Sequence, residues 1–92
     1  MRIFKYTLAP RDMQEVMLPQ GATPLYVAEQ FGNIVLYAHV LPDRPMEPRT
    51  VWIHGTGHET QFSQEAKPLG VVTLEGGALM FHVFIEPEGF KP

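Results

Sequence analysis

The sequence contains no cysteine, which excludes a disulfide framework, a cysteine-based zinc site and a thiol nucleophile. Serine is almost as scarce, since Ser63 is the only one. The residues around Ser63 do not form a nucleophile elbow, which excludes that type of serine hydrolase site. Basic residues are also few: 7 Lys and Arg face 10 Asp and Glu, for a formal net charge of −3. A polybasic nucleic-acid binder is therefore excluded. A nucleic-acid polymer is a disfavoured partner, since phosphate neutralisation supplies most of that affinity.

Long hydrophobic runs are missing as well. The most weakly polar stretch, residues 76–85, is too short to cross a bilayer and contains His82. The first six residues lack the apolar run and the small-residue cleavage site of a signal peptide. We therefore expect no membrane partner and a cytoplasmic location.

What is present is the composition of one folded domain spanning residues 1–92. Hydrophobic residues make up 45% of the chain and charged residues 18%, an ordinary balance for a globular protein. Nine prolines and eight glycines separate short segments that are rich in β-branched and aromatic residues. This pattern predicts an all-β fold, a small barrel or sandwich of about six to seven mostly antiparallel strands. Strands are expected at residues 2–8, 15–18, 25–30, 34–41, 50–54, 70–75 and 78–86.

The last two of these strands are predicted to form a C-terminal β-hairpin, with Gly76 and Gly77 as a two-residue turn. Its register pairs Leu74 with Leu79, and Val72 with Phe81. Gly32 and Asn33 are expected to reverse the chain earlier. Residues 42–48, which hold three prolines, are expected to be irregular, and residues 58–67 to form a helical turn or a loop.

Several predicted strands are apolar on both faces, whereas a half-exposed strand normally alternates apolar and polar residues. The second faces carry aromatic and histidine side chains: Tyr37, His39, Trp52, His54, His82 and Phe84. These faces could be covered within one chain, or form a homodimer interface or a ligand groove. A large exposed apolar patch is unusual in a small protein without a partner, so we favour a homo-oligomer.

The most suggestive segment for chemistry is the glycine-rich turn around Thr56. Glycines on both sides of a small hydroxyl residue let consecutive N–H groups point at one spot, a nest that binds anions. Flanking histidines could add hydrogen bonds or a proton, and arginines of the proline-rich segment could clamp a phosphate or carboxylate. The candidate ligand-binding residues are Arg44, Arg49, His54, Gly55, Thr56, Gly57, His58 and His82.

Other interpretations of this segment stay open. It could be a tight loop with incidental histidines. It could also contribute His54 and His58 to a metal site with three protein ligands and a water. Further ligands would then come from His39, His82, and Glu59 or Glu86. The leading interpretation involves no metal, no cofactor and no catalytic residue.

Four short segments of the chain resemble a small uncharacterised family of single-domain proteins from bacteriophages, prophages and their bacterial hosts. The segments are residues 3–6 (IFKY), 19–22 (PQGA), 55–58 (GTGH) and 76–84 (GGALMFHVF). The resemblance implies a phage or bacterial origin, with the host cytoplasm as the location. It implies no activity and no catalytic residues.

Taken together, the sequence favours a non-enzymatic, homo-oligomeric phage-type binding protein. In the first hypothesis it sequesters a small anionic or nucleotide-derived ligand, in a role that counters host defence. In the second it is a protein–protein interaction module whose aromatic face blocks a host target. The third hypothesis is a histidine-dependent metalloenzyme.

Overall fold

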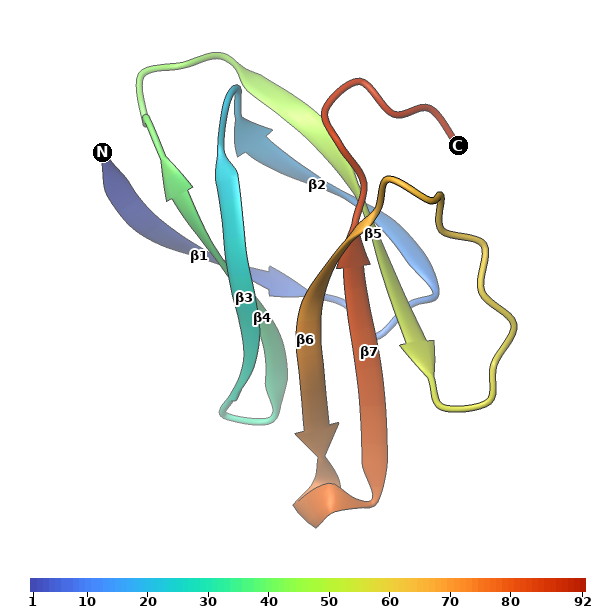
Figure 1. Ribbon diagram of the computed structural model, residues 1–92. Coiled ribbons are helices and arrows are strands. Elements are labelled where there is room, and N and C mark those ends of the chain that lie inside the picture. Colours follow the sequence, from blue (N-terminus) through green and yellow to red (C-terminus); the bar gives the residue numbers. More distant parts are fainter.

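The computed structural model describes residues 1–92 and shows an all-β sandwich of two antiparallel sheets (Figure 1). Sheet A has the strand order β1-β4-β3, and sheet B has the order β2-β5-β7-β6. The strands are β1 (Arg2–Leu8), β2 (Met13–Pro19), β3 (Thr23–Gln30), β4 (Asn33–Val40), β5 (Met46–Gly55), β6 (Lys67–Leu74) and β7 (Leu79–Ile85). One short 3-10 turn, η1 (Glu75–Gly77), joins β6 to β7. The all-β prediction is confirmed, and the sheets do not close into a barrel.

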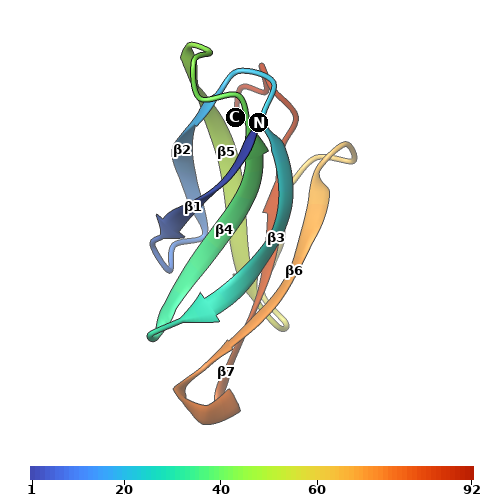
Figure 2. The same cartoon turned by 90° about the vertical axis from the view of Figure 1, so that its left-hand side faces the viewer.

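The two sheets pack against each other as two layers, with sheet A in front of sheet B in Figure 2, and enclose the hydrophobic core. Strands β3 and β6 adjoin at one side of the sandwich, where the Lys67 ammonium donates to the Pro24 carbonyl at 2.8 Å. Alternate residues of the central strands fill the core: Leu36, Ala38 and Val40 from β4, Val51 and Ile53 from β5, and Val83 and Ile85 from β7. No helix in the structure has the length and apolarity that a membrane span requires.

The C-terminal hairpin has the predicted register, which pairs Leu74 with Leu79 and Val72 with Phe81. Its turn is longer than predicted. The strands end at Leu74 and resume at Leu79, so that four residues rather than two connect them. Three of the four have positive φ, namely Glu75, Gly76 and Gly77.

The prediction that residues 42–48 are irregular is wrong in part, because β5 already begins at Met46. Pro48 lies inside this strand and pairs with Met17 of β2. The other neighbour of β5, strand β7, pairs only from Val51 onward. Pro48 therefore sits where one side of β5 has no partner strand, a position that tolerates the missing N–H.

The reversal between β3 and β4 also lies one residue earlier than predicted. Phe31 (φ 53) and Gly32 (φ 82) form the two-residue turn, and Asn33 already pairs with Gln30. Positive φ at both central residues is the type I′ geometry, which matches the twist of a β-hairpin.

The two-sided apolar character of β5 is explained by the segment between β5 and β6. Residues 59–66, which we call the strap, lie over the outer face of sheet B. Phe62 of the strap stacks on Phe84, with ring centroids 4.0 Å apart, and lies 6.0 Å from the His54 ring. Trp52 and His54 are thereby buried. On sheet A, in contrast, Tyr37 stays half-buried beside Tyr26.

Candidate functional site

Three chain reversals gather at one end of the sandwich, and Figures 1 and 2 both show them there. They are the β3–β4 turn at Phe31 and Gly32, the turn at residues 55–58 that follows β5, and the β6–β7 turn at residues 75–78. We call this end the tip. Two hollows open on it. One, of about 350 Å³, lies between Glu29 and the β6–β7 turn. The other, of about 300 Å³, lies between the 55–58 turn and the start of β7.

The 55–58 turn is closed by a hydrogen bond from the His58 N–H to the Gly55 carbonyl at 3.1 Å. Gly57 occupies the third position with φ 87, which is type II geometry and favours glycine. The N–H groups of Thr56 and Gly57 form no backbone hydrogen bond within the protein. They are therefore free to meet an external acceptor.

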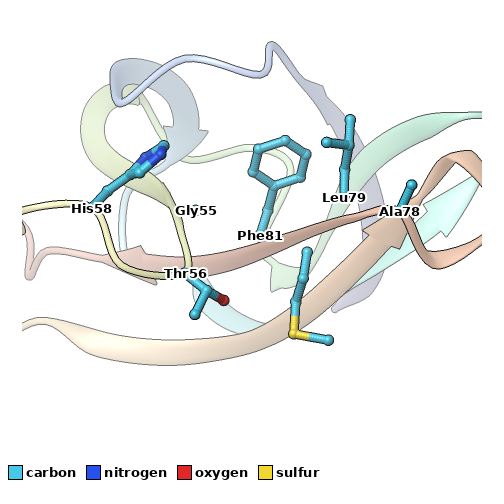
Figure 3. Close-up of a pocket in the computed structure, with 7 residues that line it drawn as sticks. Gly55, Thr56, His58, Ala78, Leu79 and Phe81 are labelled. Carbon is cyan, nitrogen blue, oxygen red and sulfur yellow. The ribbon is translucent and has the colours of Figure 1, made fainter.

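His58 folds back over Gly55. A Cβ added to Gly55 would lie 2.9 Å from the His58 Cε1 atom, so the imidazole occupies space that only glycine leaves open. Figure 3 shows the His58 ring on the same side as Phe81 and Leu79, above the ribbon. This hollow therefore has one imidazole and otherwise mainly apolar walls.

Two further histidines of the predicted site lie side by side, since His54 of β5 pairs with His82 of β7. Their environments differ. The His82 Nε2 atom lies 2.8 Å from the Thr56 hydroxyl, which ties β7 to the turn. His54 is only 4% exposed and neither of its ring nitrogens has a hydrogen-bond partner. The structure thus joins His82 to the turn and places His54 under the strap.

The structure does not bring the two arginines to this turn. Arg49 lies six positions before Gly55 on β5, or about 20 Å away at the rise of a strand. Arg44 lies on the exposed loop before β5, farther along the same direction. The predicted clamp drew both arginines from the proline-rich segment, whereas the early start of β5 fixes Arg49 in a strand.

Arg49 instead has a structural role. Its guanidinium donates to the Glu86 carbonyl at 2.9 and 3.2 Å and to the Ala22 carbonyl at 3.4 Å. An ion pair with Glu88 at 4.0 Å completes the set. Burial lowers the pKa of Arg49, and the carboxylates of Glu88 and Glu47 oppose that shift. Arg49 therefore fastens the chain after β7 to the β2–β3 turn.

Phe31 is the residue at the tip that sequence reasoning missed. Its side chain is 92% exposed, the largest value among the exposed large hydrophobic residues, and its φ of 53 is rare for a bulky residue. The available signal was a Phe-Gly pair between two strand-like segments, where Asn-Gly is the usual type I′ sequence. Three exposed glutamates lie in or beside these reversals: Glu75 in the β6–β7 turn, Glu29 near the end of β3, and Glu59 directly after the 55–58 turn.

The residues considered for a metal site do not converge. No group of three or more His, Cys, Asp or Glu side chains in the structure could hold a metal ion. The strand pairing explains this, because His39 lies on sheet A while His54 and His82 lie on sheet B.

A family model described as "Domain of unknown function (DUF7352)" matches residues 1–91, so the chain belongs to this family. The expected resemblance to a small uncharacterised family is confirmed at this level. Comparison with curated proteins and with solved structures found no match.

Proposed function

We propose that this protein acts without catalysis, by binding a partner protein with its tip. The observation that carries this proposal is the exposed ring of Phe31, held on a tight two-residue turn. A left-handed backbone is unfavourable for a bulky side chain, and strained positions cluster at functional sites. Aromatic residues that fill a partner's pocket supply much of the energy of protein interfaces.

The other residues of the tip indicate what kind of partner fits. Leu79 and Met80 are 41% and 47% exposed at the start of β7, and the two hollows flank the β6–β7 turn. The carboxylates of Glu29 and Glu75 lie around the hollow nearest to Phe31. The partner should therefore offer an apolar pocket for the ring, bordered by basic side chains.

Capture from a bacterial lysate on immobilised protein tests this proposal when three forms are compared. They are the wild type, Phe31→Asn and the matched control Ile3→Thr, which alters a 60% exposed residue on the edge strand β1. We expect one polypeptide to be retained by the wild type and by Ile3→Thr, released by raised salt, and lost from Phe31→Asn. Equal retention by all three forms, or none by the wild type, would contradict the proposal.

A second candidate function is the binding of a small anionic, nucleotide-derived ligand at the 55–58 turn. The free N–H groups of Thr56 and Gly57, beside the Thr56–His82 contact, favour it. Amide chemical shifts recorded during titration with ADP test this function. Gly57→Val should abolish the shifts while Gly89→Val, which places the same residue at a comparable φ of 80 in open space, should preserve them. Unaltered affinity in Gly57→Val would refute this site.

We also propose that the protein acts in the cytoplasm of phage-infected bacteria, where blocking a host protein would counter host defence. The resemblance of four segments to phage and prophage proteins supports this setting. Fluorescence microscopy of the tagged chain in an infected host tests the location, and recovery of the chain outside the cell would contradict it.

Self-association is a separate proposal. Exposed methionines on the outer face of sheet B, at Met13, Met17 and Met46, form a surface that a second copy could cover. A native mass spectrum should then show multiples of 10.4 kDa. A spectrum with the monomer alone would contradict self-association and leave the tip proposal intact.

A further inference from the structure

The strap covers a compact aromatic cluster on the outer face of sheet B. The cluster consists of Trp52 and His54 from β5, Phe84 from β7, and Phe62 from the strap itself. The Phe62 ring stacks on Phe84 at an interplanar angle of 20°. Phe62 therefore fills a flat slot whose other walls are strand residues.

A single carboxylate, that of Glu86, accepts the hydrogen bonds that tie the strap to the sheet. Ser63 donates its backbone N–H to Glu86 Oε2 at 2.8 Å and its hydroxyl to Glu86 Oε1. The Trp52 indole N–H donates to Glu86 Oε2 at 2.8 Å. The other hydrogen bonds of Ser63 and its neighbours, to Glu65 and Ala66, stay within the strap.

Glu86 is fully buried, and its charge state matters for what could replace the strap. Burial acts to raise the pKa of Glu86, but the hydrogen bonds from Ser63 and Trp52 outweigh it and hold that pKa below its usual value. At neutral pH the slot thus contains an ionised carboxylate that accepts two hydrogen bonds from the strap on its two oxygens.

One polar group in the slot is not satisfied by the strap. His54 is buried against the Trp52 and Phe62 rings, and neither of its nitrogens has a partner. A buried polar group without a hydrogen bond is costly, and such groups in folded proteins call for an explanation. The phenyl ring of Phe62 cannot supply a partner, whereas a heteroaromatic ring in the same place can.

We propose that this slot is a binding site for a guanine base, and that Phe62 and Ser63 are a plug which the base displaces. A guanine ring would stack on Phe84 in place of the Phe62 ring. Its adjacent N1–H and N2–H groups would donate to the two oxygens of Glu86 in place of Ser63, a bidentate arrangement that suits a carboxylate. The guanine O6 atom would supply the acceptor that the His54 N–H lacks.

The same reasoning predicts which bases the slot rejects. Adenine presents an amino donor next to the N1 lone pair, which would face the charged Glu86 oxygen and repel it. Inosine keeps N1–H but lacks the N2 amino group, so it donates one hydrogen bond to Glu86 where guanine donates two. Stacking contributes some affinity for every base. Recognition of guanine is therefore shown by affinities that decrease in the order guanosine, inosine, adenosine.

Titration of the whole protein with guanosine, inosine and adenosine, followed by fluorescence, tests the proposal. Trp52 is the only tryptophan and lies in the slot, so its emission reports on binding directly. Three forms are compared: wild type, Ser63→Ala, and Gln64→Ala as the matched control on an exposed strap residue. Ser63→Ala removes one bond of the plug to a charged acceptor and opens the slot more often.

We expect Ser63→Ala to bind guanosine about tenfold more tightly than the wild type, because a hydrogen bond to a charged group is lost only from the closed state. Gln64→Ala should match the wild type, and inosine and adenosine should each bind at least about tenfold more weakly than guanosine. No guanosine binding to Ser63→Ala, or equal affinity for guanosine and adenosine, would overturn the proposal. These nucleoside comparisons do not depend on the folding of a Glu86 variant.

Discussion

Replacing Phe31 by asparagine should stabilise the protein, because the native turn holds a bulky residue in a left-handed conformation. Such a backbone costs an ordinary L-residue roughly 1–2 kcal/mol, and asparagine tolerates it better. The Phe31 ring is 92% exposed, so little packing is lost with it. The change also creates Asn-Gly, the preferred type I′ sequence, with Gly32 unchanged. We expect a gain of about 1 kcal/mol, which raises the Tm by about 4–8 °C in a domain of this size.

Thermal unfolding followed by the fluorescence of buried Trp52 measures this shift, and Phe31→Ala is its control. Alanine removes the ring but keeps a side chain at φ 53, so it should leave the Tm close to that of the wild type. A lower Tm in Phe31→Asn, with a similar loss in Phe31→Ala, would refute the reasoning. It would mean that the ring packs against the protein and is not free for a partner.

Two further predictions concern the core and the buried carboxylate. Leu36 is fully buried between the sheets, so Leu36→Ala should lower the free energy of unfolding by about 2–5 kcal/mol in urea titrations. A loss below about 1 kcal/mol would contradict the assignment of Leu36 to the core. The lowered pKa of Glu86 stabilises the fold above the pKa of the unfolded chain, and this contribution disappears as the pH falls through the folded value. Between pH 7 and pH 3 the wild type should therefore lose more stability than Glu86→Gln, and parallel pH profiles would contradict this linkage.

Most of the fold could be predicted from the sequence because strand signals are local. Proline ended β1, and the Gly76-Gly77 pair predicted the register of the C-terminal hairpin, in which Val72 lies opposite Phe81. The start of β5 could not be predicted. Pro48 argues against a strand unless one side of the strand at Pro48 is known to have no partner, and that depends on how far β7 extends along β5.

The candidate site could be predicted from the sequence only in part. Neighbouring residues such as Thr56 and Gly57 necessarily stay together in the turn, and His82 joins them through strand pairing. Arg49 could not be placed, because its distance from the turn follows from the length of β5. The burial of His54 depends on where the strap packs, which no periodicity encodes.

The most direct test of the tip as a protein-binding surface is photo-crosslinking in living bacteria that contain the protein. The photoreactive amino acid p-benzoylphenylalanine, which keeps an aromatic ring, is introduced at Phe31 in one variant and at Ile3 in another, since both side chains are exposed. The proposal predicts a discrete crosslinked product of higher mass from position 31 and none from position 3. The absence of a product at position 31, or the same product from both positions, would contradict it.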